Sequence, residues 1–210
     1  MGVKMDWVNH IKQNDRIQMS ICVHPKFQRI YLKPGKVAGT TIFRKALQPM
    51  GGWIIKKDNP NEFNAWLNRI TDRELYYEYF KFTFARNPFA RLVSAWNDID
   101  RQTYPNFDDF VENNILDSDG KPKRLHYQTQ TSLFYSSKKK YNFIGKVENI
   151  NNDWKKYCEI TGTDCVSLGH YAKSEHKPYK EYYSEWSMKR VAEIYEDDFK
   201  CFKYRRKFNV

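Results

Sequence analysis

Two glycines, two lysines and two threonines stand close together in the segment YLKPGKVAGTT, residues 31–41. Lysine offers a mobile positive charge, and threonine hydroxyls donate hydrogen bonds. Glycine lets the backbone turn tightly and approach a ligand closely. The segment joins a strand-like run to a helix-like run, and a helix start carries unpaired N–H groups and a positive dipole end. It therefore predicts an anion site suited to a phosphate, although an ordinary strand-to-helix turn with exposed lysines has the same composition.

The order of these residues differs from that of the nucleotide-binding P-loop. The P-loop pattern GxxxxGK[ST] places lysine directly after the second glycine, whereas here Lys36 precedes Gly39 by three positions. We expect Lys36 at the mouth of the loop, where it reaches the group beyond the phosphate. This order, together with the lack of a clear magnesium-binding aspartate, counts against a kinase-like phosphotransferase.

A second segment, FKFTFARNPFARLVSAW at residues 80–96, repeats the design. Arg86 ends an alternating, aromatic strand-like run, and Asn87 and Pro88 are residue types that cap and open helices. Ser94 follows two helical turns later, and helical side chains lean toward the N-terminus. Arg86 and Ser94 are thus predicted to converge on a second phosphate, with arginine giving a bidentate contact. A salt-bridged arginine and a serine between packed helices are the alternative for this segment alone.

The elements that must hold these segments alternate between strand and helix. Alternating apolar residues predict strands, and a 3.6-residue apolar period with capping residues predicts helices. Strands are predicted over 29–34, 76–86 and 141–147, and helices over 40–50, 61–70, 87–99, 107–116, 149–162 and 184–202. This order predicts one α/β domain over residues 1–210, with a central, mainly parallel sheet flanked by helices. Ligands bind such sheets at the carboxyl ends of the strands, which both segments follow.

The chain carries a formal net charge of +11, which favours an anionic partner. Its basic residues are spread along the chain, and its aromatic residues fall within strand and helix patterns. Both features argue against a nucleic-acid-binding protein, the main alternative for a basic chain. No apolar run approaches the ~18 residues of a membrane span, and the first residues contain no signal-peptide apolar region. We therefore expect a soluble, cytoplasmic protein.

The cysteines give little sign of a metal site. Cys22, Cys158, Cys165 and Cys201 form no CxxC pair, so free thiols in a reducing compartment are the simplest interpretation. Cys158 and Cys165 would be able to bridge in an oxidising compartment, and this alternative stays open. We expect no bound metal ion.

Together, the two segments resemble the PAPS-dependent sulfotransferases, in the branch that includes the carbohydrate sulfotransferases. The resemblance rests on KVAGTT after a strand and on RNPFARLVSA. The segments LHYQTQTSLFYSSKKKYNFIGKVENINNDW and YYSEWSMKRVAEIYEDDFKCFKY agree with it, and it covers most of residues 29–49, 79–98 and 124–205. It implies a P-loop-like sulfotransferase fold. It also implies transfer of a sulfuryl group from PAPS (3′-phosphoadenosine 5′-phosphosulfate) to a hydroxyl of a glycan or other small molecule, without a metal.

The resemblance also implies which residues bind the donor. Lys36 would contact the bridging oxygen and the leaving phosphate, while Arg86 and Ser94 would hold the 3′-phosphate. The polar loop 171–179 is expected to cover the nucleotide, unless it is only a surface loop. The predicted donor-binding residues are Lys36, Val37, Ala38, Gly39, Thr40, Thr41, Arg86, Ser94, Lys173 and Ser174. Gly35 stands between Pro34 and Lys36, where the family usually has proline directly before its lysine, so Lys33 remains a competitor.

An acceptor hydroxyl also needs a general base. His126 is the leading candidate, because imidazole has an unperturbed pKa of ~6.5 and because the related family has a histidine in this segment. The rival bases are the carboxylates Asp98, Asp100 and Glu78, whereas Glu148 is expected to order the local backbone. Acceptor specificity is expected in residues 50–75 and 101–125, where the resemblance is poor.

Overall fold

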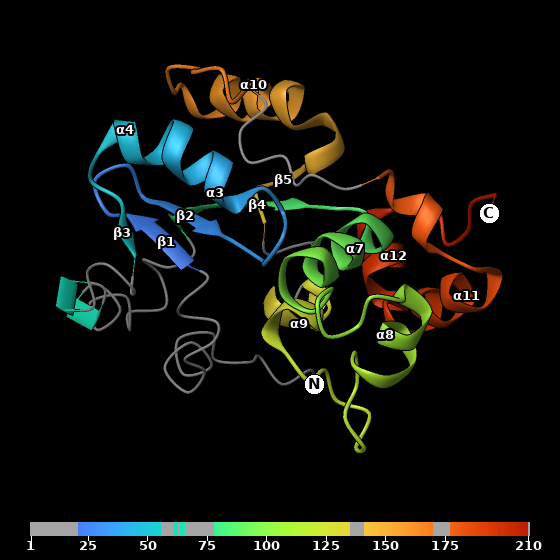
Figure 1. Cartoon of the computed structure of the whole chain (residues 1–210). Helices are drawn as coiled ribbons and strands as arrows, with labels where there is room; N and C mark the ends of the chain where they lie inside the picture. The colour runs from blue at the N-terminus through green and yellow to red at the C-terminus, as the bar shows by residue number, and fades with distance from the viewer. Residues whose placement is uncertain are drawn as a thin grey trace, which may run out of the picture.

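A computed structural model of the chain describes residues 21–55, 61–62, 64–65, 78–134, 141–169 and 177–209. Its five-stranded sheet has the order β3-β1-β2-β4-β5 (Figure 1). The strands are β1 (Ile21–His24), β2 (Arg29–Leu32), β3 (Ile54–Ile55), β4 (Phe80–Ala85) and β5 (Phe143–Lys146). β4 pairs in parallel with β2 and β5, whereas β1 is antiparallel to β2 and β3. The expected α/β class is confirmed, with a mixed sheet whose parallel strands lead to the predicted anion segments.

The predicted strands are found with shorter ends. The 29–34 strand ends at Leu32, the 141–147 strand spans Phe143–Lys146, and the described part of the 76–86 strand is Phe80–Ala85. β1 was not predicted. It is a four-residue strand buried on both faces, and such a short apolar run lacks the alternation that identifies a half-buried strand.

The first long helix is built from three consecutive pieces, α3 (Gly39–Ile42), a π-helical turn η1 (Phe43–Leu47) and α4 (Gln48–Met50). It ends at Gly51, whose φ of 66° lies in the left-handed region. The prediction of a helix over 40–50 is therefore confirmed. Most of the helix predicted at 61–70 lies outside the described residues.

The other helices include α9 (Gln130–Phe134), which was not predicted. They are α7 (Pro88–Ile99), α8 (Phe107–Asn113), α9, α10 (Ile150–Thr161), α11 (Glu185–Ile194) and α12 (Glu196–Phe202), with 3₁₀ turns η2 (Leu125–Tyr127), η4 (Val147–Asn149) and η5 (Tyr179–Tyr182). Asn87 caps α7 by accepting a hydrogen bond from the Phe89 N–H at 2.9 Å. Gly162 ends α10 in the left-handed conformation.

One predicted helix is wrong in its extent. The helix over 184–202 is two helices, because Tyr195 leaves the helical region at φ −106° and ψ 24°. The buried Tyr195 hydroxyl donates to the Tyr127 carbonyl at 2.7 Å, and Asp198 in the next turn reaches Gln130 at 2.7 Å. The side chains of Tyr195 and Asp198, three residues apart, thus both contact the segment 127–130.

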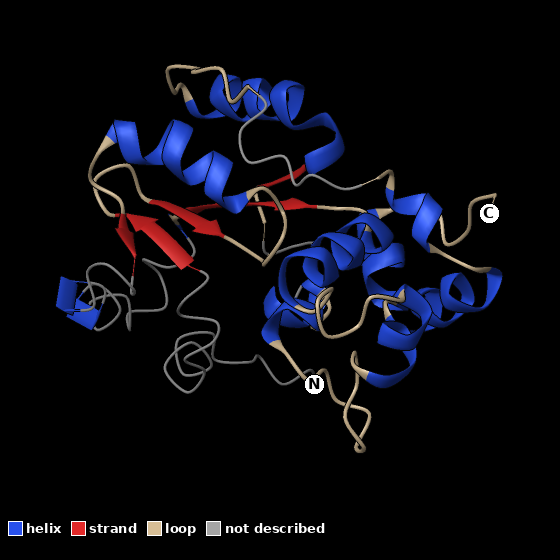
Figure 2. Ribbon diagram, in the orientation of Figure 1, coloured by secondary structure: helices blue, strands red, loops and turns tan. Residues whose placement is uncertain are grey.

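Two apolar cores correspond to two halves of the molecule (Figures 1 and 2). α3, α4 and α10 cover one face of the sheet, over a core that includes Tyr31, Phe82 and Trp154. The helical half, α7, α8, α9, α11 and α12, packs around a second core that includes Phe89 and Trp96. β4 leads directly into α7, so the carboxyl end of the sheet meets the helical half at the two predicted anion segments.

Candidate active site

The loop after β2 has an unusual backbone. Lys36 and Ala38 have φ values of 66° and 57°, in the left-handed region that few residues other than glycine adopt. Val37, which lies between them, has a negative φ. A backbone that alternates in hand turns successive N–H groups toward one side and forms an anion-binding concavity. Strain of about 1–3 kcal/mol for such residues is found mainly where function requires it.

The left-handed turns of this loop lie at Lys36 and Ala38 and not at its two glycines. The glycines provide space instead. A Cβ at Gly35 would lie 2.9 Å from Cδ2 of His126, and a Cβ at Gly39 would overlap the Lys33 side chain. Gly35 thus allows the His126 ring to pack directly against the loop, and the Lys33 side chain lies over Gly39.

The helix that follows the loop presents its first N–H groups at the same place. The hydrogen bond from Ile42 N to Ala38 O, 3.0 Å long, begins the i→i−4 series. The N–H groups of residues 39–41 precede it and have no carbonyl one turn earlier within the helix. Thr40 is exposed, whereas Thr41 is only 4% exposed. This geometry suits a bound phosphate or sulfate group.

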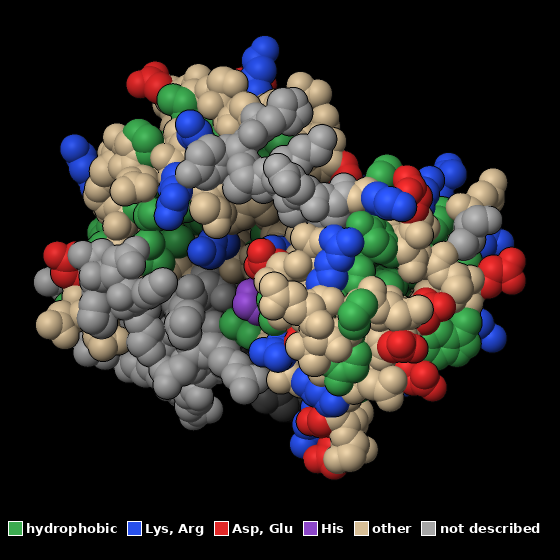
Figure 3. Space-filling view, viewed as in Figure 1, with side chains coloured by type: hydrophobic (Ala, Val, Ile, Leu, Met, Phe, Trp, Pro, Cys, Tyr) green, Lys and Arg blue, Asp and Glu red, His purple; other side chains and the backbone are tan. Residues whose placement is uncertain are grey.

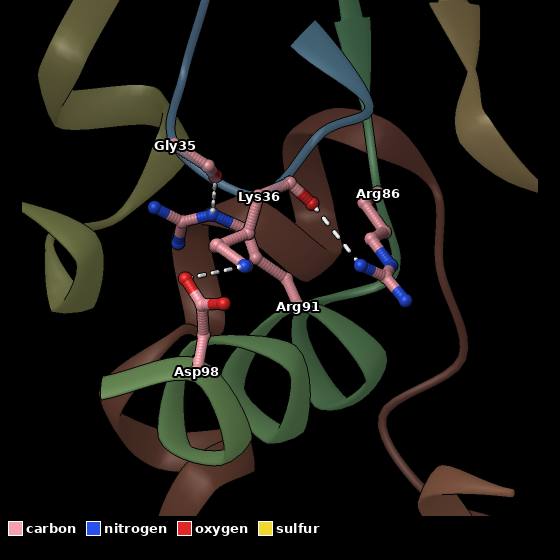
Figure 4. A network of polar contacts seen from close by, with 5 residues as sticks. All are labelled: Gly35, Lys36, Arg86, Arg91 and Asp98. Carbon is pink, nitrogen blue, oxygen red and sulfur yellow. Dashed lines mark hydrogen bonds and ion pairs between the residues drawn. The ribbon is translucent and has the colours of Figure 1, made fainter. Parts of the chain in front are cut away.

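Lys36 and Arg86 meet although they are fifty positions apart (Figure 4). The Arg86 Nη1 donates to the Lys36 carbonyl at 3.2 Å. The Lys36 Nζ lies 3.1 Å from Oδ2 of Asp98, near the end of α7. The structure therefore joins the two segments that the sequence singled out, and it adds Asp98 as the partner of the lysine.

Arg91 forms hydrogen bonds with the backbone of the loop and was not predicted as a site residue. Its Nε donates to the Gly35 carbonyl at 2.9 Å and its Nη1 to the Gln128 carbonyl at 2.8 Å. The residue is 1% exposed, and this burial lowers the pKa of its guanidinium, which Asp198 partly opposes. A buried arginine that bonds two carbonyls is a fixed structural support. In the sequence, the signal that could have identified Arg91 is its place as the second arginine of RNPFAR.

His126 lies in η2, half-buried against Gly35. Its pKa is lowered from 6.5, first by burial and then by the positive charges of Arg91 and Lys36, while Asp98 acts in the opposite direction. The neutral imidazole is therefore the favoured form at pH 7. A neutral imidazole can accept a proton, as a general base must.

The rival carboxylates are less suited to act as a base. Asp98 is paired with Lys36, and Asp100 is 3% exposed with its Oδ1 3.1 Å from Arg124. Glu78 precedes β4, at the opposite end of that strand from Arg86. Glu148 orders the backbone as expected, because its Oε1 accepts the Asn87 N–H at 2.8 Å.

The remaining predicted residues differ in how far the structure describes them. Ser94 is 3% exposed within α7, and its contact with a phosphate stays a prediction. Lys173 and Ser174 lie outside the described residues. Among the residues that the structure describes, no group of three or more His, Cys, Asp or Glu side chains is arranged to hold a metal ion. The four cysteines, which all lie among the described residues, form no disulfide with one another.

Figure 3 shows the face on which the two halves meet, with basic, acidic and histidine side chains around a hollow between them. In a comparison with known protein families, residues 20–205 match the model of the sulfotransferase family. The chain therefore belongs to the sulfotransferase family, and sulfuryl transfer is its class of activity. Searches of curated proteins and of solved structures found no significant match. Within the described segments, no helix is long and apolar enough to cross a membrane.

Proposed function

We propose that the protein transfers the sulfuryl group of PAPS to a hydroxyl group, most simply one on a carbohydrate. The observation that carries the proposal is the meeting of three separate segments at one point. Arg86 Nη1 donates to the Lys36 carbonyl at 3.2 Å, and His126 packs against Gly35, the neighbour of Lys36. The tertiary structure thus brings Arg86 and His126 to the backbone of the loop that carries Lys36.

The first loop would hold the reactive end of the donor. Its concave backbone from Lys36 to Ala38 and the N–H groups of residues 39–41 suit the 5′-phosphosulfate. Arg86 and Ser94 would hold the 3′-phosphate, which distinguishes PAPS from ATP. A phosphate that binds at Lys36 would compete with Asp98, since a lysine ammonium in a 3.1 Å ion pair is already engaged.

When bound, PAPS supplies a sulfuryl group attached to a phosphate leaving group. Lys36 would neutralise the negative charge that grows on the departing phosphate oxygen, a role in which preorganised charge has large effects. His126 would take the proton from the acceptor hydroxyl as its oxygen attacks sulfur in line. The proton would then reside on the imidazole, and the bond between sulfur and the bridging oxygen would be broken.

The test is binding followed by transfer. Adenosine 3′,5′-bisphosphate, the product side of the donor, should raise the melting temperature and bind more tightly than adenosine 5′-monophosphate in calorimetry. Labelled sulfate from PAPS should then appear on members of a panel of neutral and anionic glycans. Equal affinity for the two nucleotides, or release of label to water alone in the presence of the full panel, would contradict the proposal.

A further inference from the structure

A buried carboxylate in the C-terminal helix lies directly behind the second anion segment. Asp198, in the first turn of α12, is 0% exposed. Its Oδ2 accepts the Gln130 N–H at 2.7 Å, and its Oδ1 accepts the Thr131 N–H at 2.8 Å and the Thr131 hydroxyl at 2.9 Å. Asp198 therefore caps the start of α9 from another helix, where negative charge is favourable.

The Gln130 side chain extends this contact to Arg86. Its Oε1 accepts the Arg86 N–H at 2.9 Å, and its Nε2 donates to the Arg86 carbonyl at 2.9 Å. The same Nε2 lies 3.2 Å from Asp198 Oδ2. One side-chain amide thus pairs with both peptide groups of a single residue, as a neighbouring strand would. Arg86 follows Ala85, the last residue of β4 that pairs with β5.

We propose that Asp198 and Gln130 are positioning residues for the donor nucleotide, which fix the backbone of Arg86 so that its guanidinium meets the 3′-phosphate. The proposal rests on the proposed function of Arg86. It gives a role to the C-terminal segment YEDDF, residues 195–199, which takes no part in the proposed reaction. Because Gln130 is also 0% exposed, its contacts with Arg86 are shielded from competition by water.

The side chain of Arg86 is also constrained by its surroundings. The guanidinium of Arg86 donates a hydrogen bond to the Lys36 carbonyl at 3.2 Å. Burial lowers the pKa of Arg86, and the charge of Glu148 partly opposes this effect. The backbone contacts therefore hold a partly desolvated cation in place, which reduces the side-chain ordering that donor binding would otherwise require.

The experiment compares two nucleotides that differ only in the 3′-phosphate. Gln130→Met keeps the length of the side chain and removes both hydrogen bonds to Arg86. We expect adenosine 3′,5′-bisphosphate to bind at least tenfold more weakly, and adenosine 5′-monophosphate to change by less than threefold. Asp198→Asn should act in the same direction. If that variant does not fold, Gln130→Met alone decides the outcome.

The matched control is Tyr183→Phe, which also removes a buried hydrogen bond from a side chain to the backbone near the start of α7. The Tyr183 hydroxyl donates to the Phe89 carbonyl at 3.0 Å. This control should lower the melting temperature without changing the ratio of the two affinities. If Gln130→Met lowers only the melting temperature and keeps the wild-type ratio, the positioning role is wrong. If the wild-type protein does not distinguish the nucleotides, the 3′-phosphate function itself has failed.

Discussion

The two anion segments differ in what holds them. The first loop, residues 33–41, has left-handed turns at Lys36 and Ala38, and its lysine is paired with the 62%-exposed Asp98. The second segment has an arginine whose peptide groups are both bound by a buried glutamine. In the first segment, Lys36 can exchange Asp98 for solvent or a ligand. In the second segment, the backbone of Arg86 is held by a buried side chain.

This difference agrees with the chemistry proposed for each end of the donor. The reactive end needs a lysine that follows charge as it moves to the leaving oxygen, and lysine is a flexible point charge. The 3′-phosphate end needs only to stay bound, and a planar arginine with a fixed backbone is suited to this. The comparison predicts that changes in the first loop affect turnover, and that changes in the second segment affect donor affinity.

The largest effect is expected from Lys36→Ala. Loss of the charge that stabilises the leaving phosphate should lower the turnover number by about 10²–10³-fold. The melting temperature should change little, since the partner of the lysine, Asp98, is 62% exposed and such ion pairs contribute little to stability. Transfer of labelled sulfate measures the effect, with Lys33→Ala as the matched lysine control. A Lys33→Ala variant that loses more activity than Lys36→Ala would reverse the assignment.

Arg86→Ala should act mainly on affinity. Hydrogen bonds to charged groups contribute about 1.5–3 kcal/mol, so adenosine 3′,5′-bisphosphate should bind roughly ten- to a hundredfold more weakly. Adenosine 5′-monophosphate should bind almost as before. Calorimetry with both nucleotides measures the difference, and Arg101→Ala, an exposed arginine at the end of α7, is the control. Equal weakening of the two nucleotides would remove the 3′-phosphate role of Arg86.

Gly35→Ala tests whether the loop positions the base. The new Cβ would lie 2.9 Å from Cδ2 of His126, so the ring must move. Misplacement of a catalytic group by about 1 Å can cost 10²-fold, and we expect turnover to fall about tenfold or more. Bisphosphate affinity should change by less than about threefold. Unchanged turnover in a folded variant would show that the His126 position is unimportant.

The pH dependence gives a smaller, graded test. A base must be neutral, and the pKa of His126 is lowered from 6.5. The imidazole therefore stays neutral to lower pH than an ordinary histidine, and kcat/KM should fall with acid only below about pH 6.5. The acid limb should disappear in His126→Gln. An acid limb with a midpoint above 6.5, or one that persists in the variant, would point to another base.

The smallest effect is expected from Asp98→Asn. Removing the carboxylate frees Lys36 for the donor, and exposed ion pairs contribute at most about 1 kcal/mol. Adenosine 3′,5′-bisphosphate should therefore bind roughly two- to fivefold more tightly. Calorimetry at low and high salt measures the change, which salt should reduce because it screens the pair. Weaker binding in this variant would mean that Asp98 supports the site rather than competes for its lysine.

Much of the fold was readable because each element carries its own local signal. Asn87 and Pro88 opened a helix, Gly162 ended one, and aromatic alternation identified β4. The two short, fully buried strands β1 and β2 differed in whether the sequence predicted them. β2 was predicted because a recognisable loop follows it, whereas β1 was not predicted. The break at Tyr195 was not predicted, and the contact of Tyr195 with Tyr127 joins residues far apart in the chain.

The sequence alone determined which residue types stand where strands end and helices begin, because turns, caps and periodicity depend on neighbours along the chain. Lys36 and Arg86 were proposed in this way, whereas His126 was proposed from its side-chain chemistry and from the family resemblance. Only the tertiary structure decided that Asp98 pairs with Lys36, that Gly35 makes room for His126, and which side chains hold the Arg86 backbone. These contacts join segments far apart in the chain, and their burial and hydrogen bonds exist only when the two halves have packed together.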